Sequence, residues 1–184
     1  MLITPGYVKT QADAHEDKNY GVASRIYAPL VSKLCDKLNV TDILDYGAGK
    51  CRLFANLQVG HAMKLQAYDP AIPSLAARPL PSQLVCCLDV LEHIEPDCLD
   101  EVLDDLQALT LEFGFFSIAT TPAVRTLSDG RNAHLIIEDA GWWLPKIIAR
   151  FELQSFQKIQ HGFIVTVTRR HGDFDVCRAS DRAN

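Results

Sequence analysis

The sequence predicts an α/β fold, in which a mostly parallel sheet is flanked by helices and ends in an antiparallel strand near the C-terminus. Short apolar strands alternate with helical segments through the first two thirds of the chain, which is typical of parallel sheets. The strand at 84–88 is apolar without interruption, as expected for a strand that is covered on both faces. Two strand-like segments around His161-Gly162 end the pattern as an antiparallel pair.

Each element follows from a local pattern of apolar residues. Residues 1–20 show no clear periodicity, whereas 22–38 has helical spacing that Pro29 should kink or delay. The segment 71–82 holds three prolines and predicts no full helix. The remaining expected elements are strands at 41–46, 64–68, 84–88, 115–121, 153–159 and 163–168, and helices at 52–58, from Pro96 to Leu109, and at 138–150.

Composition limits the class of protein. The 184 residues suit one domain, which we place at 1–168 with an N-terminal lid or helix and a polar tail at 169–184. No apolar run approaches the roughly 18 residues of a membrane span and no signal peptide opens the sequence, so we expect a cytoplasmic protein without a membrane partner. The net charge of −5 disfavours nucleic acid as a partner without excluding it. The six cysteines form no CxxC pair, which predicts reduced thiols.

The most informative segment is a strand that runs into Gly47-Ala48-Gly49. Two glycines between a strand and a helix place bare backbone where a ligand can approach closely. A dinucleotide-binding GxGxxG fingerprint would need glycine at position 52, where this chain has Arg52, so nicotinamide and flavin dinucleotides are disfavoured. The alternative interpretation is a turn that needs glycines for its backbone alone.

This segment resembles the first motif of class I S-adenosylmethionine-dependent methyltransferases, an acid followed by three alternating glycines. Asp45, Gly47 and Gly49 match, and Cys51 stands in for the third glycine. Asp69 ends the second strand, where the family has the acid that holds the ribose hydroxyls. The run 88–96 resembles the fourth-strand motif written VLEH, and 116–122 resembles the fifth strand. The resemblance covers roughly residues 20–168.

The resemblance implies a Rossmann-like fold that binds S-adenosylmethionine. The family has a helix and a third strand after the ribose acid, but 70–83 is too short for both, so that strand should be reduced or absent. Ala71, Ile72 or Leu88 would then frame the adenine. The implied cofactor-binding residues are Asp45, Tyr46, Gly47, Ala48, Gly49, Asp69, Pro70, Leu88 and Asp89.

The resemblance also implies methyl transfer to an O or N atom of a small molecule or of the exposed end of a larger one. Glu92, His93 and His134 are the candidate catalytic residues, with His93 as a general base. A non-catalytic cofactor-binding module is one alternative, because the third strand is trimmed. The sequence does not indicate the oligomeric state.

A second alternative is a metal-assisted enzyme. Asp89-x-x-Glu92-His93 resembles the ExxEH signature by which small-RNA 2′-O-methyltransferases and ubiquinone-pathway O-methyltransferases hold a divalent metal, and His134 follows the fifth strand as a further histidine does in the RNA enzymes. Asp89, Glu92, His93 and His134 could then bind Mg²⁺, Mn²⁺ or Zn²⁺. We expect a metal-free site, because Asp89 is shorter than the glutamate of the signature.

Overall fold

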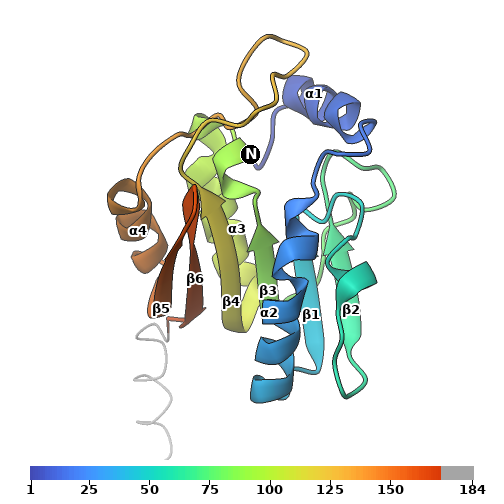
Figure 1. Cartoon of the computed structure of the whole chain (residues 1–184), viewed down its shortest axis with the longest axis vertical. Coiled ribbons are helices and arrows are strands. Elements are labelled where there is room, and N and C mark those ends of the chain that lie inside the picture. The colour runs from blue at the N-terminus through green and yellow to red at the C-terminus, as the bar shows by residue number, and fades with distance from the viewer. Residues whose placement is uncertain (171–184) are drawn as a thin grey trace, which may run out of the picture.

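A computed structural model describes residues 1–170 and contains one six-stranded sheet (Figure 1). The strand order is β2-β1-β3-β4-β6-β5. The sheet is built from β1 (Asp42–Tyr46), β2 (Lys64–Tyr68), β3 (Ser82–Leu88), β4 (Thr110–Ala119), β5 (Phe151–Ile159) and β6 (Gly162–Arg169). The four longer helices are α1 (Pro5–His15), α2 (Ala23–Leu38), α3 (Leu99–Leu109) and α4 (Ala140–Ile148).

The sheet confirms the predicted α/β class. Strands β2, β1, β3 and β4 pair in parallel, whereas β6 pairs antiparallel with both β4 and β5. Within residues 1–170, the segment between β2 and β3 contains neither a helix nor a strand, so the expected loss of the third strand is also confirmed. The carboxyl ends of the parallel strands therefore meet at one edge of the sheet, the upper edge in Figure 1.

Helices cover both faces of the sheet. Helices α3 and α4 pack on one face over Cys87 and Phe116, and α2 packs on the other face over Cys86 and Phe115. The neighbouring residues Cys86 and Cys87 of β3 thus pack into the hydrophobic clusters on opposite faces of the sheet, because successive side chains of a strand point to opposite faces. Burial raises the pKa of both β3 thiols well above their usual value. The five cysteines among the described residues are free, as expected, and Cys177 lies outside those residues.

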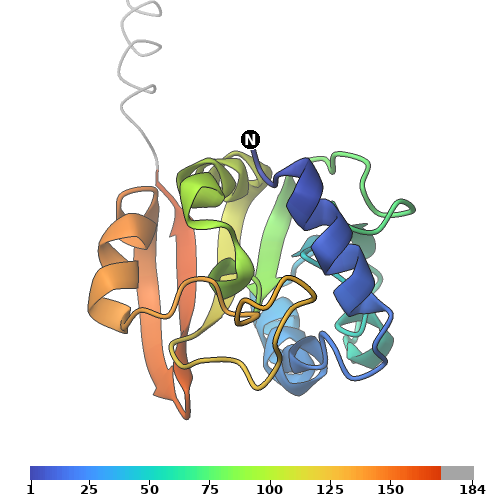
Figure 2. The same cartoon turned by 90° about the horizontal axis from the view of Figure 1, so that it is seen from above.

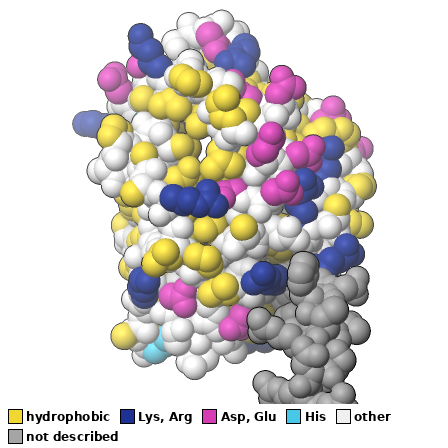
Figure 3. Space-filling view, turned by 180° about the vertical axis from the view of Figure 1, so that it is seen from behind, with side chains coloured by type: hydrophobic (Ala, Val, Ile, Leu, Met, Phe, Trp, Pro, Cys, Tyr) yellow, Lys and Arg dark blue, Asp and Glu magenta, His cyan; other side chains and the backbone are white. Residues whose placement is uncertain are grey.

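The outer surface of α3 is acidic, as the run of Asp and Glu in its sequence indicates. Acidic side chains gather on the face of the molecule that α3 covers (Figure 3). Arg150 bridges two of them, with N–O distances of 3.1 Å to Asp100 and 2.5 Å to Asp104. Among the described residues, no helix is long and apolar enough to cross a membrane.

Residues 5–15 form α1, in the N-terminal part for which we expected a lid or helix. The bounds of α1 could not be predicted, because its buried positions Tyr7, Gln11 and Ala14 carry little hydrophobic contrast. One sequence expectation was wrong. The expected helix at 52–58 is only a 3-10 turn, η1 (Phe54–Asn56). Gly49 and Cys51 have left-handed backbone angles just before it, which interrupts a regular helix. The predicted tail falls largely on residues 171–184, which lie outside the described part of the chain.

Candidate active site at the carboxyl ends of the parallel strands

A cavity of about 840 Å³ opens at the carboxyl ends of β1, β2 and β3. Its walls come from the glycine segment after β1, the turns after β2 and β3, helix α1 and the loop between β4 and α4. Helix α1 and that loop lie across this edge of the sheet (Figure 2). The volume lies within the range of ligand pockets, about 300–1,000 Å³, and the carboxyl edge of a parallel sheet is where such ligands bind.

The glycine segment lies directly against this cavity. Gly47 and Gly49 have φ angles of 77° and 49°, which side-chain-bearing residues rarely adopt. The amides of Gly47 and Ala48 both donate to the carbonyl of Tyr68, at 2.8 and 3.0 Å, which ties the segment to the end of β2. A Cβ at Gly47 would lie 2.5 Å from a methyl carbon of Val90. The first glycine is therefore required by both its backbone angle and its surroundings.

Tyr46 lines the cavity, whereas Asp45, the residue before it, is buried away from the cavity. Asp45 is 1% exposed, does not line the cavity, and its Oδ2 atom has no hydrogen-bond partner among the described residues. Burial, and then the nearby carboxylate of Asp69, raise the pKa of Asp45 to about 7. The hydroxyl of Tyr46 donates to Asp105 at 3.1 Å within the core.

Asp69 is fixed at the cavity wall by two backbone amides. Its Oδ2 accepts from the amide of Gly49 at 3.0 Å, and its Oδ1 accepts from the amide of Ala71 at 2.9 Å. The Nε2 atom of His15 lies 3.5 Å from Oδ2. Each carboxylate oxygen has a second lone pair, so Asp69 can still accept two hydroxyl hydrogens from a ligand. Pro70 and Leu88 line the same cavity.

A second polar group lies at the end of β3. Asp89 has a left-handed φ of 59°, and its amide donates to the hydroxyl of Ser117 at 3.0 Å. Glu92 is fully buried and does not line the cavity; its Oε1 accepts from the amide of Ala119 at 2.6 Å. Burial, and then the neighbouring Asp89, raise the pKa of Glu92 well above its usual value. A protonated Glu92 carboxyl would be uncharged and would not repel the neighbouring Asp89.

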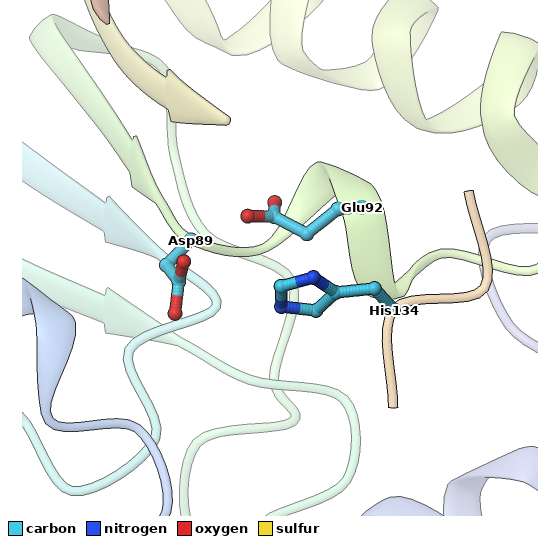
Figure 4. A group of neighbouring side chains, drawn as sticks. All are labelled: Asp89, Glu92 and His134. Atoms are coloured by element: carbon cyan, nitrogen blue, oxygen red, sulfur yellow. The ribbon is translucent and has the colours of Figure 1, made fainter. Parts of the chain in front are cut away.

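Figure 4 shows that the carboxylates of Asp89 and Glu92 and the ring of His134 point toward one another. Each offers one ligand atom, and these atoms lie within 4.8 Å of one another. Oε2 of Glu92 is buried without a partner among the described residues. Two carboxylates and an imidazole therefore fit a divalent cation. His93, the fourth residue of the predicted metal set, is not part of this group.

His93 and His134 present the same tautomer to the cavity. Nδ1 of His93 donates to the carbonyl of Ala133 at 2.8 Å, and Nδ1 of His134 donates to the carbonyl of Thr121 at 2.6 Å. Their rings lie edge to face, 4.8 Å apart. Burial lowers the pKa of His93 to about 4, so this imidazole is neutral near pH 7 and its Nε2 can accept a proton.

Helix α1 contributes two residues that the sequence analysis missed, Tyr7 and Gln11. The hydroxyl of Tyr7 donates to the carbonyl of His93 at 2.7 Å and accepts from the side-chain amide of Gln11 at 2.6 Å. Tyr20, which follows α1 and which the sequence suggested as a lid residue, donates its hydroxyl to the same Gln11 side chain at 2.8 Å. Thr4 and Pro5, a helix-capping residue followed by proline, were the signal that could have predicted this helix.

Comparisons with solved structures identify the fold. At 16% identity and a TM-score of 0.67, over 92% of both chains, the protein is similar to 1,6-didemethyltoxoflavin-N1-methyltransferase from Burkholderia thailandensis with bound 1,6-didemethyltoxoflavin and S-adenosylhomocysteine. The chain has the fold of class I S-adenosylmethionine-dependent methyltransferases. No family model and no curated protein matches the sequence.

Two further structures share this class I fold. One is DhpI in complex with SAH, at 16% identity and a TM-score of 0.64, over 90% of this chain and 98% of DhpI. The other is magnesium protoporphyrin IX methyltransferase from Synechocystis PCC 6803 with bound SAM, at 14% identity and a TM-score of 0.60, over 89% and 94% of the two chains. The fold implied by the resemblance is thus confirmed, whereas the roles of individual residues remain predictions.

Proposed function

We propose that the protein transfers a methyl group from S-adenosylmethionine to an O or N atom of a small molecule or of an exposed chain end. One observation carries this proposal. A single cavity joins the glycine segment and Asp69 on one side to His93 and His134 on the other. The structural neighbours that hold S-adenosylmethionine or its demethylated product support the same interpretation.

The cofactor side of the cavity has the groups that this ligand needs. When bound, S-adenosylmethionine supplies an electrophilic methyl group on a sulfonium. Asp69 would accept the two ribose hydroxyls, and the bare backbone at Gly47 and Gly49 would let the amino-acid end approach. Asp45 lies behind this segment, where an ionised carboxylate attracts the ammonium of the ligand. Pro70, Leu88 and Asp89 would complete the wall.

The acceptor side supplies a proton acceptor. His93 is neutral and fixed by Ala133, and its lowered pKa makes it a weak base. Its Nε2 would take the proton of an acceptor hydroxyl or amine as the acceptor bonds to the methyl carbon, while the bond from that carbon to the sulfonium sulfur breaks and the thioether leaves. His134 would help to orient the acceptor. Glu92, fully buried, would act by holding the end of β4 through Ala119. Methyl transfer is an in-line displacement, so most of what the chain must supply is alignment.

We expect the affinity for S-adenosylhomocysteine to fall below pH 7. The raised pKa of Asp45, about 7, means that its carboxyl gains a proton as the pH falls through that value and then no longer attracts the ammonium. Because protonation of the Asp45 carboxyl competes with binding, the affinity falls by about tenfold for each pH unit below this pKa. Calorimetric titrations from pH 5.5 to 8.5 measure this slope. Asp45→Asn should give a weak affinity without the slope, and an equal slope in Asp45→Asn would contradict the role of Asp45.

A divalent cation at Asp89, Glu92 and His134 is the second candidate, because these side chains converge. A cation there would polarise an acceptor hydroxyl and lower its pKa. We expect no cation to bind, since the raised pKa of Glu92 favours its protonated carboxyl, which would have to lose its proton to coordinate an ion. Electron paramagnetic resonance should therefore show free Mn²⁺ in the presence of the protein, with the same spectrum for Asp89→Asn. Bound Mn²⁺ that is lost in Asp89→Asn and His134→Asn, together with chelator-sensitive turnover, would establish the metal-assisted site.

A further inference from the structure

Part of the cavity wall is apolar, and we call this part the apolar end. Ala71, Val90, Ile94 and Val102 line it, together with Leu2 from the N-terminal segment. Leu2, Val90 and Ile94 all pack against the core cluster that contains Val102. The segment after β2 contributes Pro70 and Ala71 to the cavity lining, and Leu2 adds an apolar side chain from the N-terminal segment.

The segment that carries Leu2 is held by a two-point contact, which we call the Thr4–Glu95 clasp. The amide of Thr4 donates to Oε2 of Glu95 and the hydroxyl of Thr4 donates to Oε1, both at 2.9 Å. Hydrogen bonds to an ionised carboxylate are stronger than neutral ones. Glu95 directly follows Ile94, which lines the apolar end, and Figure 2 shows the N-terminal end of the chain between α1 and α3.

The two backbone amides that donate to Asp69 indicate how a nucleoside would be oriented in the cavity. Oδ2 faces the amide of Gly49, and Oδ1 faces the amide of Ala71. A nucleoside whose 2′ and 3′ hydroxyls meet Asp69 carries its base on C1′ and its 5′ substituent on C4′, the two carbons that flank the ring oxygen. If the 5′ substituent extends over the glycine segment, the base extends past Ala71 into the apolar end. A flat aromatic base gains most from burial between apolar walls.

We propose that Leu2, positioned by the Thr4–Glu95 clasp, forms one wall of the pocket for the adenine of the cofactor. Leu2 is the contact residue, and Thr4 and Glu95 are positioning residues that act through it. The inference rests on the proposed function, because it assigns a purine to this cavity. It adds Leu2 to Ala71, Ile72 and Leu88, the residues that the sequence suggested for the adenine wall.

Leu2→Ala tests the wall directly. We expect calorimetry to show binding of S-adenosylhomocysteine and of 5′-methylthioadenosine weakened by the same factor, about tenfold or more, the scale of lost methylene contacts. The two ligands share the base and the ribose, and only the first has the amino-acid end. Leu80→Ala, at a residue that is 62% exposed and does not line the cavity, is the matched control and should bind both as the wild type does. Unchanged binding in Leu2→Ala, or a loss confined to S-adenosylhomocysteine, would overturn the proposal.

The clasp is tested by its coupling to Leu2. Glu95→Ala should weaken binding of both ligands and should add little in combination with Leu2→Ala, because both changes remove one wall. Glu138→Ala, at an exposed glutamate, is the control. Thr4→Ser keeps the hydroxyl and should bind normally, whereas Thr4→Val should not. Fully additive losses in the double variant would show that the clasp does not position Leu2.

The wild-type titration separates this inference from the proposed function. If the wild-type chain binds neither ligand, the proposed function fails. If the wild type binds both and Leu2→Ala binds equally well, only the adenine wall fails. Thermal unfolding of each variant shows whether a loss of binding reflects a loss of folding.

Discussion

Asp69→Ala should weaken the binding of S-adenosylhomocysteine by about 1–3 kcal/mol, or roughly 5- to 150-fold, because a charged acceptor of two hydroxyl hydrogen bonds is lost. The carboxylate also accepts from the amides of Gly49 and Ala71, so the alanine variant frees two backbone segments that line the cavity. Both effects act in the same direction. Isothermal titration calorimetry gives the dissociation constants.

Asp69→Asn separates these two effects. The amide oxygen of asparagine can still accept from one backbone N–H, but the negative charge is gone. We expect an intermediate affinity for this variant and a thermal stability close to that of the wild type. Asp13→Ala, at an exposed position of α1, controls for the change in net charge and should leave affinity unchanged. Wild-type affinity in Asp69→Ala would mean that the ribose is held elsewhere.

Gly47→Ala should destabilise the fold and abolish cofactor binding. The φ of 77° is unfavourable for alanine, and the new Cβ would lie 2.5 Å from a methyl carbon of Val90. Backbone strain and overpacking together should lower the free energy of unfolding by about 2–4 kcal/mol. Relief of the clash would shift the amides of the glycine segment away from the ligand. Chemical denaturation measures the stability, and calorimetry measures the binding.

Gly130→Ala is the matched control for this substitution. Gly130 also has a left-handed backbone, with a φ of 87°, but nothing lies within 4 Å of the position of its Cβ. Gly130→Ala should lower the free energy of unfolding by about 1 kcal/mol through its backbone angle alone and should leave binding unchanged. Equal losses of stability and binding in the two variants would show that the contact with Val90 is unimportant.

The sheet could be predicted from the sequence because its signals are local. An unbroken apolar run predicted β3, a short apolar strand before Gly47 predicted β1, and the short length of 70–83 predicted the loss of the third strand. Asp69 could be placed at the site because it ends a strand of a parallel sheet. The cavity indeed lies at that edge.

The lid over the site could not be predicted in the same way. Helix α1 buries Tyr7 and Gln11 through hydrogen bonds to one another and to the backbone of His93, and such bonds leave no hydrophobic periodicity. His15 reaches Asp69 only because α1 folds back over the glycine segment. The contact of Thr4 with Glu95 is likewise non-local, since 91 residues separate the two.

The sequence also could not predict which acidic side chains are buried. Asp45 and Glu92 are carboxylates in motifs that the family resemblance places at the site, yet neither lines the cavity. Asp45 lies behind the glycine segment, and Glu92 accepts from the amide of Ala119 at the end of β4. A pattern of residue types indicates that a polar group is near a site, whereas side-chain direction depends on the surrounding packing.

The central claim is that the cavity holds a nucleoside methyl donor. Calorimetric titration of the wild-type chain with S-adenosylhomocysteine, in parallel with NAD, tests it most directly. We predict saturable binding of one S-adenosylhomocysteine per chain in the low-micromolar to millimolar range, about 4–8 kcal/mol, and no measurable binding of NAD. Saturable binding of NAD, or no binding of S-adenosylhomocysteine, would contradict the account.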